Sequence, residues 1–147
     1  MSLLLKLLAF TFGALMPVQV GINASLRLLL RDPFLAGLAN MAVGAACIVV
    51  LLVLLRVPLP ALATLAAVPP WAWLGGAIGA GVVVVSLVAG PKLGAATLFV
   101  LIVAGQIAGS LFLDHFGFMG YPVRPFTLLR VLGAVLLVAG VVLIVRH

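Results

Sequence analysis

The chain has 147 residues, of which 67% are hydrophobic and only 7% are charged. Soluble domains carry roughly a quarter of charged residues, and a chain this short could not bury so much apolar surface in one core. The composition therefore excludes a soluble globular domain and predicts an integral membrane protein in contact with the lipid bilayer.

The formal net charge is +6, but the basic residues stand singly or in pairs between long apolar runs. Nucleic-acid binding needs a contiguous basic surface, so a nucleic-acid partner is not expected. We interpret the charges as borders of membrane spans. They are Lys6, Arg27, Arg31, Arg56, Lys92, Arg124, Arg130 and Arg146.

A helix needs about 20 apolar residues to cross the hydrocarbon layer of a bilayer. Charges and prolines place such spans at about residues 7–26, 34–55, 71–89, 93–113 and 126–145. No segment shows the period of two that a transmembrane β-barrel requires. The sequence therefore predicts an all-α protein with five transmembrane helices, forming a single domain over residues 1–147.

Local chemistry marks the first borders. Asp32 followed by Pro33 is typical of an N-cap and the first residue of a helix. Four prolines between residues 56 and 70 predict a surface connection with room for a short interfacial helix. The third span then begins at Trp71 and Trp73, whose rings favour the membrane–water boundary.

The borders of the later spans are marked by other residues. Gly90-Pro91-Lys92 predicts a tight break between the third and fourth spans. The fifth span is expected to begin near Phe126, with the side chain of Arg130 reaching back to the interface.

The charges do not favour one orientation. Five spans put Lys6, Arg56, Arg124 and Arg130 on one side, and the other four basic residues on the opposite side. Orientation normally follows an excess of Lys and Arg in cytoplasmic loops. Either one loop charge outweighs the others, or the chain inserts both ways. Insertion both ways would let an antiparallel homodimer supply the two inverted halves on which many transporters are built.

Small residues at the GxxxG spacing allow helices to approach closely in lipid. Gly75 and Gly79 have this spacing in the third span, and Gly105 and Gly109 repeat it in the fourth. These faces are predicted to pack, either within one protomer or across a dimer.

Polar side chains within the spans must find partners or line a wet cavity. Gln19 and Asn23 lie four residues apart, on one face of the first span, just after Pro17. With Asn40 and Gln106 they are our candidates for binding a substrate. Interhelical hydrogen bonding is the alternative role. By depth, Gln106 of an inverted chain would lie level with Gln19.

Only two carboxylates are present, Asp32 and Asp114. Capping accounts for Asp32, so Asp114 beside His115 is the candidate for proton or cation coupling. An ion pair with Arg124 or another boundary arginine is the structural alternative. The lack of a carboxylate deep in a span disfavours a proton-coupled pump for cationic drugs. No metal cluster, nucleophile with a base or phosphate loop is visible, so neither an enzyme nor a cofactor is expected.

Several segments together resemble one family. Pro17-Val18-Gln19 with Asn23, the run from Pro70 to Gly76, Gly105-Gln106 and the segment Asp114 to Gly117 are similar to the YdcZ-like inner-membrane exporters. This family belongs to the drug/metabolite transporter superfamily. The resemblance implies a bacterial inner-membrane location, a transport role and antiparallel pairing with itself or a close paralogue. The chain would then be one half of an inverted-repeat architecture.

Two functional hypotheses follow. The first is a secondary transporter that exports a small molecule by alternating access as an antiparallel homodimer. The second is a membrane accessory protein that stabilises or regulates a partner and transports nothing.

Overall fold

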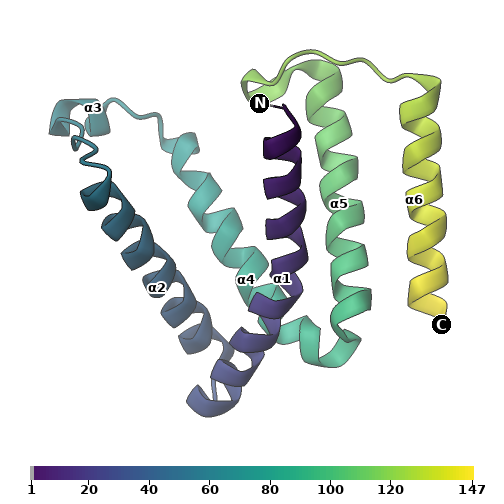
Figure 1. Cartoon of the computed structure of the whole chain (residues 1–147), viewed down its shortest axis with the longest axis horizontal. Coiled ribbons are helices and arrows are strands. Elements are labelled where there is room, and N and C mark those ends of the chain that lie inside the picture. Colours follow the sequence, from purple (N-terminus) through teal and green to yellow (C-terminus); the bar gives the residue numbers. More distant parts are fainter. Residues whose placement is uncertain (1) are drawn as a thin grey trace. The chain divides into compact units, whose positions relative to one another are not determined.

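A computed structural model describes residues 2–147, which form helices joined by short connections and no strand. Figure 1 shows the helices in chain order. They are α1 (Ser2–Leu30), α2 (Pro33–Leu54), α3 (Leu62–Ala66), the 3-10 helix η1 (Pro70–Trp73), α4 (Leu74–Leu93), α5 (Ala95–Phe116), the 3-10 helix η2 (Phe118–Gly120) and α6 (Leu128–Arg146).

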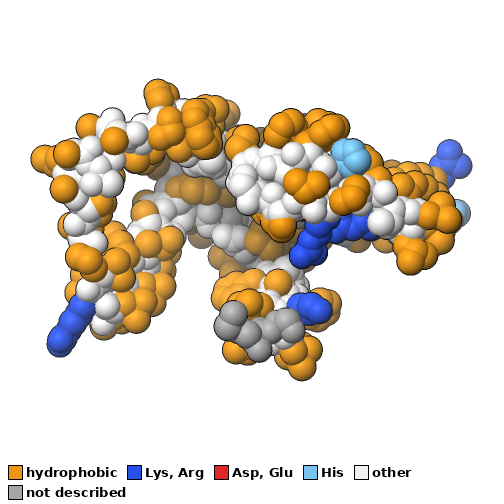
Figure 2. All heavy atoms as spheres, turned by 90° about the horizontal axis from the view of Figure 1, so that it is seen from above, with side chains coloured by type: hydrophobic (Ala, Val, Ile, Leu, Met, Phe, Trp, Pro, Cys, Tyr) orange, Lys and Arg blue, Asp and Glu red, His pale blue; other side chains and the backbone are white. Residues whose placement is uncertain are grey.

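Among residues 2–147, five helices are long and apolar enough to cross a membrane: α1, α2, α4 with η1, α5 and α6. Their large apolar side chains point outward, and residues such as Leu29 and Leu128 are 81% and 84% exposed. Figure 2 shows hydrophobic side chains over most of the visible surface. Lipid is the solvent that such a surface requires. The prediction of an all-α membrane protein with five spans is confirmed.

Contacts within the chain divide it into two compact units, Met1–Lys92 and Leu93–His147. The first unit contains α1 to α4, and the second contains α5, η2 and α6. Each unit is described separately below. One transmembrane domain over residues 1–147 stays a prediction.

The turn between α1 and α2 forms as the sequence predicts. Asp32 is the N-cap of α2, and its Oδ1 accepts hydrogen bonds from the backbone N–H groups of Phe34 and Leu35, both at 2.8 Å. Pro33 occupies the first helical position, where a missing N–H costs nothing. The carboxylate of Asp32 therefore has a structural role as the cap of α2.

The tight break predicted at Gly90-Pro91-Lys92 is wrong. Helix α4 continues through Pro91 to Leu93, and the chain turns at Gly94, whose φ of 81° is accessible to glycine. A proline in the last turn of a helix removes only one hydrogen bond, the one to the carbonyl four residues earlier. The helix can therefore end after the proline.

The helix α1 is longer than the predicted first span, because it begins at Ser2 and includes Lys6. Its membrane-crossing stretch, Leu3–Leu30, has 28 residues, more than a bilayer needs. The helix bends near its middle, where Pro17 lies within it (Figure 1). The short helix expected between the second and third spans is α3, and η1 carries Trp71 and Trp73 into α4.

In the second unit, Gly117 ends α5. Its φ of 65° is left-handed, and its N–H donates to the carbonyl of Leu113. The chain then passes through η2 and an extended connection to Thr127, whose side chain accepts a hydrogen bond from the N–H of Arg130 at the start of α6. This N-cap places the start of α6 at Leu128, two residues after Phe126.

Replacing Gly117 by alanine should destabilise this end of the second unit. A Cβ at residue 117 would lie 2.7 Å from Cγ2 of Val123, on a backbone that disfavours side chains. The left-handed conformation alone costs about 1–2 kcal/mol, and the contact adds to it. Gly120→Ala is the control, because its φ is 80° but its Cβ would meet nothing within 4 Å. The free energy of unfolding in detergent should fall more for Gly117→Ala, and equal losses would contradict the role of Val123.

Candidate functional site

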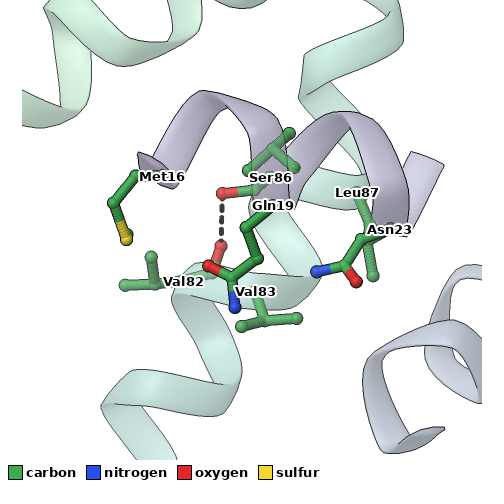
Figure 3. A pocket seen from close by; sticks show the side chains of 8 residues that line it. Met16, Gln19, Asn23, Val82, Val83, Ser86 and Leu87 are labelled. Atoms are coloured by element: carbon green, nitrogen blue, oxygen red, sulfur yellow. Dashed lines mark hydrogen bonds between the residues drawn. The ribbon is translucent and has the colours of Figure 1, made fainter. Parts of the chain in front are cut away.

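The first unit contains a small cavity of about 30 Å³ between α1 and α4. Figure 3 shows it from close by, with side chains from both helices turned toward the same space. Residues Met16, Gln19, Val20, Asn23, Val82, Val83, Ser86 and Leu87 line it.

Polar groups of two helices meet at this cavity. Asn23 is 7% exposed and Ser86 is 5% exposed, whereas Gln19 is exposed at the surface one turn away. The amides of Gln19 and Asn23 project from the same side of α1 (Figure 3). Ser86 donates its proton to the carbonyl of Val82 at 2.7 Å, so its oxygen remains free to accept. The wall offers two amides and a hydroxyl oxygen to a ligand.

The predicted pair Gln19 and Asn23 is thus brought to one cavity, but Asn40 is not. Asn40 is half-buried on α2 and does not line the cavity. The helix α2 contacts α4 at Gly37 instead, where a Cβ would lie 3.6–3.8 Å from side chains of Val83, Val84 and Leu87. A role for Asn40 in binding stays a prediction without a contact to support it.

Arg27, one turn after Asn23 on α1, forms a hydrogen bond to α4. Nη1 of Arg27 donates to the carbonyl of Leu87 at 2.6 Å. In an unbroken helix this carbonyl would accept from the N–H of residue 91, but Pro91 has none. Arg27 therefore supplies the donor that Pro91 lacks, and this bond joins α1 to α4.

The fourth candidate, Gln106, lies on α5 in the second unit, where its side chain is exposed. The glycines of the two GxxxG pairs also face open space. Among the described residues, a Cβ added at Gly75, Gly79, Gly105 or Gly109 would meet no atom within 4 Å. Packing of these faces within one protomer is therefore not seen, and packing against another chain stays a prediction.

Asp114 forms an ion pair, but with Arg130. Its Oδ2 lies 3.2 Å from Nη2 of Arg130, and both side chains are partly buried. Arg124 takes part only through its backbone, whose N–H donates to the carbonyl of Asp114 at 2.7 Å and whose carbonyl accepts from Arg130 at 3.0 Å. The sequence analysis expected Arg124 or another boundary arginine as the partner of Asp114, and the boundary arginine that forms the ion pair is Arg130. Thr127 caps α6, and the side chain of Arg130, three residues later, reaches Asp114 of α5, whereas Arg124 is exposed.

Sequence reasoning missed the roles of Arg27 and Gly37. The spacing of Leu87 and Pro91, four residues apart, identifies a carbonyl without a helical donor, and this signal was available. Which arginine supplies the donor depends on how α1 and α4 cross. No periodicity distinguishes Gly37 from the glycines that face open space.

These observations define a multi-pass helical membrane protein with a small, mainly apolar cavity that two amides and one hydroxyl adjoin. A comparison with protein families matches residues 4–143 to the family described as "Putative inner membrane exporter, YdcZ". The chain belongs to this family, and it is a multi-pass protein of the inner membrane. A search of curated proteins found no match. A search of solved structures also found none.

Replacing Arg27 by methionine should lower the stability of the first unit by about 1.5–3 kcal/mol, the usual worth of a hydrogen bond from a charged group. The free energy of unfolding in detergent measures the loss. Arg31→Met removes an equal charge four residues later and should cost less, because Arg31 is exposed.

A Pro91→Ala background tests whether the bond from Arg27 matters because Pro91 lacks an N–H. Alanine restores an N–H for the carbonyl of Leu87, so Arg27→Met should cost at least about 1 kcal/mol less in this background. Equal costs in both backgrounds would contradict the link between Pro91 and Arg27.

Proposed function

We propose that the chain is a secondary transporter that exports a small molecule by alternating access, as an antiparallel homodimer with dual topology. Membership of a family of inner-membrane exporters and five membrane-crossing helices support the transport role. The observation that supports a dimer is the size of the cavity between α1 and α4, which is too small to hold an organic substrate.

The cavity of about 30 Å³ has room for about one water molecule. Sites for small organic ligands measure roughly 300–1,000 Å³. Two amides and a buried hydroxyl at such a narrow cavity form one wall of a binding site. A second chain is the simplest source of the opposite wall, since an exporter must enclose its substrate among helices.

Gln106 supplies a suitable group on that second chain. A glutamine side chain exposed to lipid near the middle of a helix lacks hydrogen-bond partners, which is costly in hydrocarbon. With the helix bounds of the structure, Gln19 lies about 4 Å past the middle of its span and Gln106 about 1 Å past the middle of α5. In an inverted chain the two side chains would differ in depth by about 3 Å, which glutamine side chains can bridge.

The balance of basic residues supports insertion in both orientations. Each side receives four of the eight Lys and Arg residues when the five spans are followed in order. Two inverted copies then reproduce the inverted-repeat design of many transporters. In a symmetric pair, exchange of the two protomers' conformations converts an inward-open state into an outward-open state of equal energy.

The substrate that this site favours is neutral or anionic. Of the two carboxylates, Asp32 is occupied as an N-cap and Asp114 is paired with Arg130. A cationic substrate would therefore find no free counter-charge among the described side chains. Amide groups and Arg27 instead offer hydrogen-bond donors.

The second candidate is an accessory protein that stabilises or regulates a membrane partner without transporting anything. The narrowness of the cavity favours this role. In that case, Gln19 and Gln106 would hydrogen-bond to helices of the partner.

Labelling of single cysteines from one side of intact cells tests the topology. Leu3→Cys and His147→Cys, each in a Cys47→Ala background, should both be labelled in about half of the molecules. The Cys47→Ala chain without a new cysteine gives the background signal. If one terminus is always outside, the chain needs a separate inverted partner, and the homodimer is wrong.

Cross-linking tests the facing glutamines. When chains carrying Gln19→Cys and chains carrying Gln106→Cys are expressed together without Cys47, a short bifunctional thiol reagent should join them. Leu29→Cys with Gln106→Cys is the matched control, since Leu29 lies far from the middle of α1.

Gln19→Ala and Gln106→Ala should keep the dimer and lower export at least tenfold. Efflux from proteoliposomes loaded with a panel of neutral and anionic solutes gives the rate. Loss of assembly with either alanine variant, together with no efflux from the unaltered protein, would favour the accessory role.

A further inference from the structure

The end of α5 carries a histidine that holds the following connection in place. Nδ1 of His115 accepts a hydrogen bond from the backbone N–H of Phe126 at 3.1 Å. The two rings also stack, with centroids 4.2 Å apart and planes inclined by 15°. The imidazole and the ring of Phe116 are nearly perpendicular, with planes inclined by 89° and centroids 4.7 Å apart. His115 is therefore fixed on two sides by aromatic rings and by one directed hydrogen bond.

This hydrogen bond requires a particular protonation state. A ring nitrogen accepts a hydrogen bond only when it carries no proton, so the imidazole must be neutral with its proton on Nε2. Protonation would make Nδ1 a donor facing the N–H of Phe126, and two donors cannot bond. Histidine side chains in general change charge between about pH 5 and pH 8.

We propose that Nδ1 of His115 is a proton-binding site that controls the connection between α5 and α6. When the imidazole is neutral, Phe126 is held against the end of α5. When a proton binds, this hydrogen bond is lost and Phe126 keeps only the ring stacking as its contact with His115. The bond is thus present at high pH and lost as the pH falls. The proposal does not depend on the transport function.

Other bonds of the same connection limit what is released. The N–H of Arg124 donates to the carbonyl of Asp114, and Arg130 pairs with the Asp114 carboxylate and donates to the carbonyl of Arg124. None of these contacts uses the imidazole. Protonation of His115 should therefore free the stretch near Phe126 while α5 and α6 stay joined at Asp114 and Arg130.

The charged and titratable side chains on the elements around His115 are few. They are Asp114 on α5, Arg130 on α6, and Tyr121 and Arg124 in the connection. Both arginines keep their charge at every pH that matters here, so they do not switch themselves.

Amide hydrogen exchange of the full chain in lipid nanodiscs, resolved by residue with NMR, tests the proposal. After correction for the intrinsic effect of pH, the Phe126 N–H should exchange about fivefold faster at pH 5 than at pH 8, as expected for one lost hydrogen bond. The Arg124 N–H, bonded to the carbonyl of Asp114, is the internal control and should keep its protection. Equal protection of Phe126 at both pH values, or an equal loss at Arg124, would overturn the proposal.

Two variants distinguish the effect of protonating His115 from the effect of its ring stacking on Phe126. His115→Asn keeps an acceptor that cannot be protonated, so the pH dependence at Phe126 should disappear. His115→Phe keeps the stacked ring without an acceptor, so exchange should be fast at both pH values. A pH dependence that persists in His115→Asn would show that another group titrates.

The imidazole can also be observed directly. The chain has two histidines, so His147→Gln leaves one imidazole for nitrogen NMR. At pH 8 the spectrum should show an unprotonated Nδ1 and a protonated Nε2. A proton on Nδ1 at pH 8 would overturn the proposal without any reference to exchange or transport.

Discussion

The structure depends on one constraint, that every backbone polar group within a bilayer must find a partner inside the protein. Continuous helices satisfy most of these groups, and the exceptions occur where a helix begins or where a proline interrupts its hydrogen bonding. Asp32 serves the first N–H groups of α2. Arg27 serves the carbonyl of Leu87, which Pro91 leaves without a donor. The bond that joins α1 to α4 thus forms at a carbonyl of α4 that lacks a donor within its own helix.

This bond also explains why Asn23 and Ser86 lie at the same cavity. Arg27 and Asn23 are one helical turn apart, so the bond from Arg27 to α4 brings Asn23 against Ser86 and Leu87. Ser86 satisfies its proton within its own helix. The polar atoms at the crossing are therefore arranged by requirements of the backbone, and the transport function that we propose would use oxygen and amide groups that remain free.

Both carboxylates serve the ends of helices, Asp32 as a cap and Asp114 in an ion pair with Arg130. This use leaves no free carboxylate side chain among the described residues, and for this reason we place the substrates among neutral or anionic molecules. Because Asp114 is engaged by Arg130, we propose the adjacent His115 as the group that binds a proton. The imidazole is held by a bond that exists only in its neutral form, whereas the carboxylate is held by an arginine that stays charged.

The sequence by itself determined the number of spans, their approximate places and the cap at Asp32. These features depend on hydropathy and local backbone chemistry, which neighbouring residues along the chain decide. It also placed Gln19 and Asn23 on one face, since helical spacing fixes that relation. Only the tertiary structure decided that Arg27 bonds across to α4, that Gly37 packs against side chains of α4, and that Arg130 pairs with Asp114. Each of these depends on the angle and register at which two helices meet, and those are set by side chains far apart in the sequence.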